Sequence, residues 1–349
     1  MSEGVSSTTG THILFINLKS NRHSRTRNYF NGLRRMGIAC DWLDVGSFGE
    51  LRSRQDEINH YLERGSKIVI TSPSHVLVPF FILIFHRKPI LDAGWTLYDG
   101  VISSRRQYGF LASNLLKTLL IDFFSLQLAS RVLVESEAQQ KSISQRYLVY
   151  KNRLSVLLTG FDEERFGGVS SKKNDGEVGV LFRGGAQDEA GLEVLEKAIR
   201  KLGNERELKF KLITNRYKPR APFGANVELL NEYVSDEELG EAFREAGLVL
   251  GQLSNHKRLN RTIPHKFFEA ACLGKPYLSS DKGLMGELGK LGIIYVFSGN
   301  NSDDLAQSIL RIAGDLESAQ KVGDGLKEWY LKNASQRVLS QRFFEIVCK

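Results

Sequence analysis

The sequence predicts an α/β fold with two Rossmann-like, doubly wound domains that face a cleft. The chain has 349 residues, which is too long for one ordinary core and suits two domains. Short apolar runs alternate with helix-length amphipathic segments from end to end, and this alternation favours mostly parallel sheets. One polar stretch, residues 170–176, interrupts the alternation and predicts a linker.

The first half shows the alternation clearly. The expected strands are 12–18, 38–45, 67–71, 89–92, 131–134 and 154–158, and the main helices are 24–36 and 111–130. Residues 76–85 are apolar but far fewer than the roughly 20 that span a bilayer. They predict a buried helix, or at most an interfacial one.

A second series of strands and helices follows the linker. Its expected strands are 178–182, 210–214, 248–251 and 276–279, and its expected helices are 188–202, 236–246, 265–273 and 303–312. A last periodic segment covers residues 322–347. We therefore expect domains at 1–160 and 161–325 and a C-terminal helical segment at 326–349.

Composition limits the partners and the compartment. The formal net charge of +8 favours phosphate-bearing partners. Neither zinc-finger spacing nor an RNA-binding strand motif is present, so we expect no nucleic-acid partner. Cys40, Cys272 and Cys348 are scattered, which indicates reduced thiols, and residues 1–10 do not look like a secretion signal. We expect a cytoplasmic protein, with no bound metal because no histidine has metal-ligand spacing.

The most informative stretch is 261–281, RTIPHKFFEAACLGKPYLSSD. Pro264 is expected at the first position of a helix, and Lys266 and Glu269 share one face of it. A helix start beside a lysine suits a diphosphate, and a carboxylate one turn later can accept hydrogen bonds from ribose hydroxyls. The alternative interpretation is a surface helix on which Lys266 and Glu269 form a solvated pair.

This stretch resembles the donor-binding signature of retaining glycosyltransferases with the GT-B fold, in the large family that includes sucrose and mannosyl transferases. The matching residues are Pro264, Lys266, Glu269, Ala270, Gly274 and Pro276. Gly160, Asp162 and Phe166 resemble the interdomain segment of that family. Together with 181–195 and 234–250, the resemblance covers most of residues 158–312.

The resemblance implies a retaining, metal-independent hexosyltransferase that moves a sugar from a nucleotide-diphosphate donor to a saccharide or lipid-linked acceptor. Residues 1–160 would bind the acceptor, 161–325 would bind the nucleotide sugar, and the last helix would pack back on the first domain. Glu269 would hold the ribose. The remaining donor-side residues that it implies are Arg183, Gly184, Gly185, Asn215, Tyr233, Arg261, Thr262, Pro264, His265 and Lys266.

Two departures leave a rival open. Arg261 stands where the family often has a glutamate, and Gly185 and Ala190 stand where many members have an arginine and a lysine. Arg183 is the candidate substitute for these. The rival is a non-catalytic relative that binds a nucleotide sugar or a partner protein. A dinucleotide-dependent oxidoreductase is set aside, since no Gly-x-Gly-x-x-Gly follows the first strand.

The acceptor side is predicted from residues 88–107. A branch of the family has a similar pattern, matched by Lys88, Pro89, Asp92, Leu97, Tyr98, Asp99 and Arg105. We predict Asp99 and Asp92 as the catalytic carboxylates, with Asp99 orienting the acceptor hydroxyl, and Tyr98 as acceptor-binding. The alternative is that Asp92 caps a strand end and Asp99 is an exposed loop residue.

The segment 19–35 is strongly basic. We predict that Arg22 and Arg25 bind a phosphate on the acceptor or rest against anionic headgroups, which gives possible peripheral association with the inner face of the membrane. The alternative is an ordinary solvated helix face.

Overall fold

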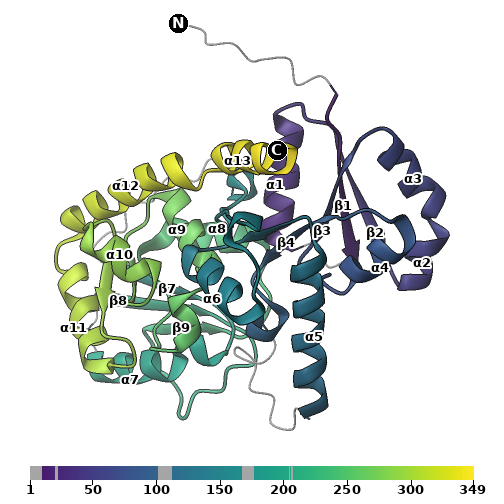
Figure 1. The fold of residues 1–349 in the computed structure, drawn as a ribbon. Coiled ribbons are helices and arrows are strands. Elements are labelled where there is room, and N and C mark those ends of the chain that lie inside the picture. The colour runs from purple at the N-terminus through teal and green to yellow at the C-terminus, as the bar shows by residue number, and fades with distance from the viewer. Residues whose placement is uncertain (1–9, 20–22, 101–111, 167–176, 204, 206) are drawn as a thin grey trace, which may run out of the picture. The chain divides into compact units, whose positions relative to one another are not determined.

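The chain folds into two compact units, seen here in a computed structural model (Figure 1). The first comprises Met1–Gly160 and Gln336–Lys349, and the second comprises Phe161–Ser335. The structure describes residues 10–19, 23–100, 112–166, 177–203, 205 and 207–349. Arg22 and Arg105 lie outside the described residues. The segment that returns to the first unit begins at Gln336 rather than at residue 326.

The first unit is built on a six-stranded parallel sheet with the order β2-β1-β3-β4-β5-β6. Its strands are β1 (Ile13–Leu18), β2 (Cys40–Val45), β3 (Lys67–Thr71), β4 (Ile90–Gly94), β5 (Arg131–Val134) and β6 (Leu154–Val156). Its helices are α1 (Ser24–Arg35), α2 (Phe48–Ser53), α3 (Gln55–Glu63), α4 (Leu77–Phe85), α5 (Ala112–Leu128), α6 (Glu137–Tyr147) and α13 (Gln336–Cys348), and η2 (Lys151–Arg153) precedes β6.

Both faces of this sheet are covered, because successive residues of each apolar strand point to opposite sides. Leu14 and Ile16 of β1 point into the core beneath α2, α3, α4, α5 and α6. Ile13 and Phe15 point to the other core, beneath α1 and α13. The rings of Phe15 and Phe343 stack at 5.6 Å, which places the C-terminal helix within the first unit.

The second unit repeats the design with the order β12-β11-β10-β7-β8-β9. Its strands are β7 (Val178–Arg183), β8 (Leu208–Ile213), β9 (Val227–Leu230), β10 (Ala246–Leu250), β11 (Tyr277–Ser280) and β12 (Tyr295–Phe297). Its α-helices are α7 (Leu192–Leu202), α8 (Asp236–Glu245), α9 (His265–Leu273), α10 (Leu284–Lys290), α11 (Ser302–Ala313) and α12 (Leu316–Asn333). The short helices are η3 (Glu163–Phe166), η4 (Asp188–Ala190) and η5 (Lys257–Asn260).

The expected fold class is confirmed by two parallel six-stranded sheets with helices around them. The bounds of α9 agree with the sequence, because Gly274 ends that helix at φ +65°. The periodic segment 322–347 was expected as one element but forms α12 and α13, separated at Ala334 and Ser335. Strands β9 and β12 were not expected, since both are short and lie at sheet edges with weak apolar patterns.

The contact between α9 and α12 generates a test of packing in the second unit. A Cβ on Gly323 would lie 2.4 Å from the backbone oxygen of Gly274, so Gly323→Ala forces backbone apart. We expect it to lower the free energy of unfolding by about 1–3 kcal/mol. Gly325→Ala, in the same helix, would meet Ile293 at an ordinary 3.5 Å. It should be neutral or stabilising, since alanine is the better helix former. Equal urea midpoints for both variants would contradict this account.

Candidate functional site

The N-terminus of α9 is open to a ligand. The sequence predicted Pro264 at the first position of the helix. The structure places it one position earlier, at the N-cap, with φ −63° and ψ 134°. Proline has no side-chain acceptor, and no side-chain cap is present. The first N–H groups of α9 therefore carry the positive end of the helix dipole without a side chain that neutralises it.

Glu269 lies one turn into α9 and is 0% exposed. Its Oε1 accepts hydrogen bonds from Arg183 Nη2 at 2.8 Å and from His265 Nδ1 at 3.1 Å. Burial by itself raises the pKa of Glu269, but Arg183 and His265 outweigh that effect and lower it to about 2. Its Oε2 is also buried and has no hydrogen-bond partner among the described residues. An ionised oxygen in that state can accept a bond from a ligand hydroxyl.

Lys266 is also buried, on the same helix. Its Nζ donates to the carbonyl oxygen of Gly251 at 2.9 Å and lies 3.9 Å from the ring centre of Phe182. Burial, and then the charge of Arg183, lower the pKa of Lys266 well below its usual value, although Glu269 opposes them. A Cβ on Gly184 would stand 3.1 Å from this ammonium, so the glycine leaves room for it.

The turn after β7 brings predicted residues together around a cavity of about 190 Å³. Arg183, Gly184 and Gly185 line it at the carboxyl end of β7, and Asn215 and Tyr233 line it from the loops after β8 and β9. The side chain of Tyr233 is 94% exposed, so it forms the rim of this cavity. Ligands of open parallel sheets bind at this edge.

Sequence reasoning missed Arg165, which also lines this cavity and forms an ion pair with Asp236. The sequence position of Arg165 could have indicated it, because Arg165 lies inside the segment that contains Gly160, Asp162 and Phe166. The resemblance drew attention to the glycine, the aspartate and the phenylalanine, and the arginine between them was passed over.

The loop before α9 is basic and partly tied down. The carboxylate of buried Glu189 pairs with Arg258 Nη1 at 2.7 Å, and the Thr262 hydroxyl donates to the Arg258 carbonyl oxygen at 3.2 Å. Arg261 follows η5 and is half-buried. The loop thus carries cationic side chains toward the start of α9. Of these, Arg258 is paired with the carboxylate of Glu189.

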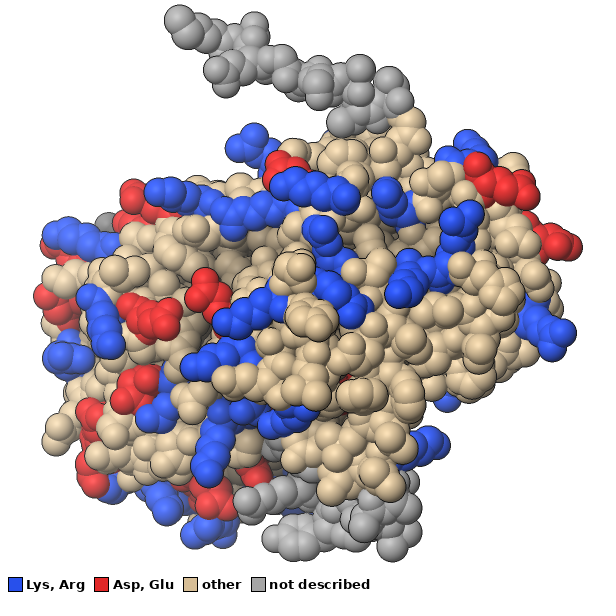
Figure 2. Space-filling view, in the orientation of Figure 1, with Lys and Arg blue, Asp and Glu red and all other residues tan. Residues whose placement is uncertain are grey.

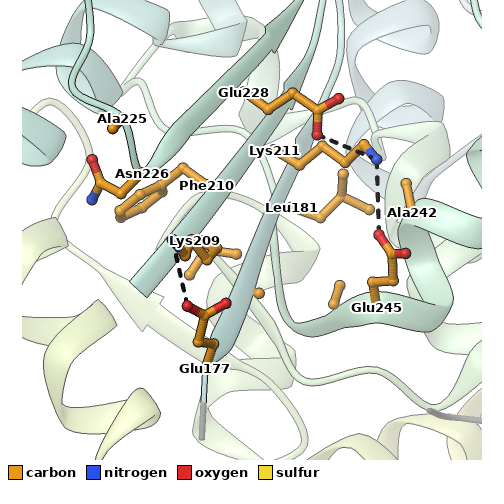
Figure 3. Close-up of a pocket in the computed structure, with 13 residues that line it drawn as sticks. Glu177, Leu181, Lys209, Phe210, Lys211, Ala225, Asn226, Glu228, Ala242 and Glu245 are labelled. Carbon is orange, nitrogen blue, oxygen red and sulfur yellow. Dashed lines mark ion pairs between the residues drawn. The ribbon is translucent and has the colours of Figure 1, made fainter. Parts of the chain in front are cut away.

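A different cavity, of about 530 Å³, lies toward the amino ends of β7 and β8 (Figure 3). Its charges pair with one another: Lys211 contacts Glu228 at 3.4 Å and Glu245 at 3.8 Å, and Lys209 contacts Glu177 at 3.4 Å. A cavity whose cations are already paired is a poor anion site. None of the predicted donor-side residues lines it.

In the first unit, Arg25 is not the surface cation that the sequence suggested. It is 0% exposed, and its Nε donates to Asp92 Oδ1 at 2.9 Å while its Nη1 donates to the Leu157 carbonyl oxygen at 2.7 Å. Burial lowers the pKa of Arg25, but the Asp92 carboxylate raises it above its usual value. The expectation that Arg25 faces an acceptor or headgroups is therefore corrected. Arg25 lies on the buried side of α1, where it is the counter-ion of Asp92.

Asp99 lies inside the first unit, 1% exposed. Its carboxylate accepts from Gln139 Nε2 at 3.1 Å and lies 3.6 Å from Arg146 Nη1. Tyr98 is half-buried, with the Arg146 guanidinium 4.8 Å from its ring centre. The structure thus joins Tyr98 and Asp99 through Arg146, whereas Asp92 belongs to the separate pair with Arg25.

No group of three His, Cys, Asp or Glu side chains in the described part of the chain is arranged to hold a metal ion.

Removal of one member of the Arg25–Asp92 pair should appear in stability. Asp92→Asn removes the carboxylate that bonds to the Arg25 guanidinium and leaves the weaker charge interaction with Glu135, which costs about 3 kcal/mol. The double variant Arg25→Met/Asp92→Leu removes both charges and should recover most of that loss in thermal unfolding. If Asp92→Asn keeps the wild-type melting temperature, the pair does not stabilise the first unit.

The low pKa of Glu269 should make stability pH-dependent. A carboxylate whose folded pKa is about 2 instead of 4.5 stabilises the fold above pH 4.5 and loses that contribution as pH falls toward 2. The full contribution is about 3 kcal/mol. Urea unfolding at a series of pH values should show that the advantage of wild type over Glu269→Gln shrinks across this window. An advantage independent of pH would contradict the assignment.

No protein-family model matches the sequence, and no curated protein matches it. Solved structures do match it over nearly the whole chain. HepE of Anabaena, in complex with UDP, is 14% identical, with 97% of this chain and 99% of that chain covered and a TM-score of 0.70. Sucrose-phosphate synthase of Thermosynechococcus elongatus is 13% identical, with 96% and 98% covered and a TM-score of 0.74.

The same comparison also finds a protein of Listeria monocytogenes assigned as a UDP-N-acetylglucosamine 2-epimerase. It is 10% identical, with 95% of this chain and 94% of that chain covered and a TM-score of 0.60. Identities this low speak to the fold alone. With its two Rossmann-like parallel sheets, the chain has the GT-B fold.

Proposed function

We propose that this chain is a glycosyltransferase that uses a nucleotide-diphosphate sugar as donor and binds the nucleotide at the start of α9. One observation carries the proposal. Glu269 Oε2 is buried, belongs to an ionised carboxylate and has no hydrogen-bond partner among the described residues. A buried acceptor left in this state is costly, and a ribose hydroxyl would supply the missing donor.

The surroundings of Glu269 suit the diphosphate. The uncapped N-terminus of α9 presents N–H groups, and the turn at Gly184 and Gly185 lets a phosphate approach the backbone. Phosphate charge near Lys266 would offset the burial that lowers its pKa and would favour the charged ammonium. The same groups would stabilise the charge that develops on the departing diphosphate during transfer.

The nucleotide itself would extend toward the cavity that Asn215 and Tyr233 line. The structure of HepE was solved with UDP, which makes UDP the first nucleotide to test. We further propose retention of configuration, catalysis without a metal, and a saccharide or lipid-linked acceptor, with peripheral association at a membrane. The candidate acceptor-side group consists of Tyr98, Asp99 and Arg146. Within this group, Asp99 would orient the acceptor hydroxyl.

A second candidate is a non-catalytic relative that binds a nucleotide sugar or a partner protein. Two observations favour it: Arg261 replaces a glutamate common in the family, and the turn at Gly184–Gly185 carries no cation of its own beyond Arg183. The fold also accommodates a protein assigned as an epimerase. Product analysis has to separate transfer, hydrolysis and epimerisation.

Calorimetry with UDP and with uridine tests the donor site. Lys266→Met keeps the apolar stem of the side chain but removes its charge, so it should weaken UDP binding by about tenfold or more and leave uridine binding nearly unchanged. Lys197→Met makes the same change at an exposed lysine of α7 and should bind both ligands as wild type does. Equal losses for UDP and uridine would show that Lys266 is structural.

Turnover tests the chemistry separately. Wild type incubated with UDP-sugars should slowly release free sugar without an acceptor, since hydrolysis needs working transfer chemistry. Asp99→Asn should keep donor affinity and lower turnover by about 10²-fold. Tight UDP binding with no release, transfer or epimerisation would favour the non-catalytic candidate. Normal turnover in Asp99→Asn would move the acceptor site elsewhere in the first unit.

A further inference from the structure

Exposed apolar side chains are concentrated on one side of the first unit. Of the fourteen large hydrophobic residues that are exposed in the described part of the chain, nine belong to the first unit. All nine lie on α2, α4, α5 or the turn after α6, and none lies on α1 or α13. They are Phe48, Phe80, Leu83, Leu116, Leu120, Phe123, Phe124, Leu148 and Tyr150. We call this surface the apolar face.

Helix α5 shows that the arrangement is regular. Leu116, Leu120, Phe123 and Phe124 recur at intervals that place them on one side of the helix, and all four are exposed. Asp122 and Leu126, on the other side, are buried against the core. The helix therefore has two apolar sides, one packed on its own sheet and one facing outward. An outward apolar stripe of this kind marks an interaction surface.

The nine residues form one surface because their elements are in contact. The rings of Phe48 and Phe80 stack at 4.0 Å and join α2 to α4. Helices α4 and α5 pack against each other beside the sheet (Figure 1). Gln127 Nε2 of α5 donates to the Leu148 carbonyl oxygen at 3.2 Å, which fixes the turn with Leu148 and Tyr150 beside α5.

The apolar face has few anions. The acidic residue of α2, Glu50, accepts a hydrogen bond from the Gly46 N–H at 2.6 Å. Helix α4 has no acidic residue, and the one in α5, Asp122, is buried with its carboxylate bonded to the N–H groups of Leu97 and Tyr98. Exposed cations follow the apolar residues closely in the chain: Arg87, Lys88, Lys117 and Lys151. In Figure 2, Lys and Arg side chains border the surface over α4 and α5.

Two of these cations also belong to a basic cavity. Arg87 and Lys88 line a hollow of about 580 Å³ at the amino ends of β3, β4 and β5. Lys67, Arg131 and Lys349 line it too, and its lining contains no Asp or Glu. Unlike the cavity in Figure 3, its cations have no lining carboxylate to pair with. An anionic headgroup next to the apolar face would find its counter-charges here.

We propose that the apolar face docks on an anionic lipid bilayer, with its leucine and phenylalanine side chains in the acyl boundary and Arg87 and Lys88 against lipid phosphates. No helix in the described ranges is long and apolar enough to cross a membrane, so contact is with the surface of the bilayer. A second copy of this chain is the poorer occupant, because a two-fold interface would set the same cationic border against itself. The inference deepens the membrane association proposed above and rests on it.

Co-sedimentation with vesicles tests the inference. Wild type should bind vesicles of phosphatidylcholine mixed with phosphatidylglycerol, bind phosphatidylcholine alone much more weakly, and dissociate as salt is raised. Leu120→Glu/Phe124→Glu should weaken binding to the mixed vesicles by about tenfold or more. Leu316→Glu/Leu331→Glu, which makes the same change at exposed residues of α12 in the second unit, should bind as wild type does.

The cationic part has its own pair of variants. Arg87→Gln/Lys88→Gln should weaken binding to mixed vesicles by about tenfold, whereas Lys197→Gln/Lys332→Gln, equally exposed in the second unit, should have little effect. Melting temperatures identify variants that do not fold, and Leu116→Gln then replaces the double glutamate variant. The inference is overturned if wild type binds neither vesicle, if the α12 control loses as much affinity, or if light scattering shows a dimer that Leu120→Glu/Phe124→Glu dissociates.

Calorimetry with UDP on the same variants keeps the two proposals separate. If the apolar-face variants lose vesicle binding and keep UDP affinity, docking and donor binding are independent. If wild type binds vesicles but not UDP, the donor site is wrong and the docking surface stands.

Discussion

The proposed donor site depends on one buried carboxylate, Glu269. Arg183 reaches it from the end of β7 and His265 reaches it from the start of α9, so its Oε1 connects the strand, the turn and the helix. The two contacts keep Glu269 ionised despite complete burial. Because Arg183 is held there, the glycine turn after β7 is held beside the helix N-terminus as well.

The same electrostatic rule serves a structural purpose in the first unit. Arg25 and Asp92 are both buried and form an ion pair, and further donors and acceptors around them are backbone or hydroxyl groups of the same unit. Arg25 Nη2 and Glu269 Oε2 are both buried without a hydrogen-bond partner among the described residues. The two pairs differ in exposure: the Arg183 side chain is 28% exposed, whereas those of Arg25 and Asp92 are 1% and 0% exposed. A candidate binding site and a structural ion pair can thus contain the same residue types and differ in whether a ligand can reach them from solvent.

The two units also differ in how the cations that line their cavities are paired. In the second unit, the cavity beside β8 and β9 neutralises its lysines with nearby glutamates. In the first unit, the hollow at the end of α4 collects cations without carboxylates, and the adjoining helices expose leucine and phenylalanine. Exposed apolar area of this extent marks an interaction surface. A partner that is anionic and apolar at once compensates for both features.

The sequence by itself determined the fold class and the limits of α9, and it proposed the residues of the candidate donor site. Apolar periodicity and the helix stop at Gly274 are local properties, and local patterns are legible in a single chain. Only the tertiary structure decided which charges meet. Arg25 belongs to a basic segment and was expected at the surface. Its partner Asp92, however, lies 67 positions away on strand β4, and the two are buried together. Arg165 lines the candidate donor cavity, and Asp99 is buried, for the same reason. Long-range contacts set the environment of a side chain, and no local sequence pattern encodes them.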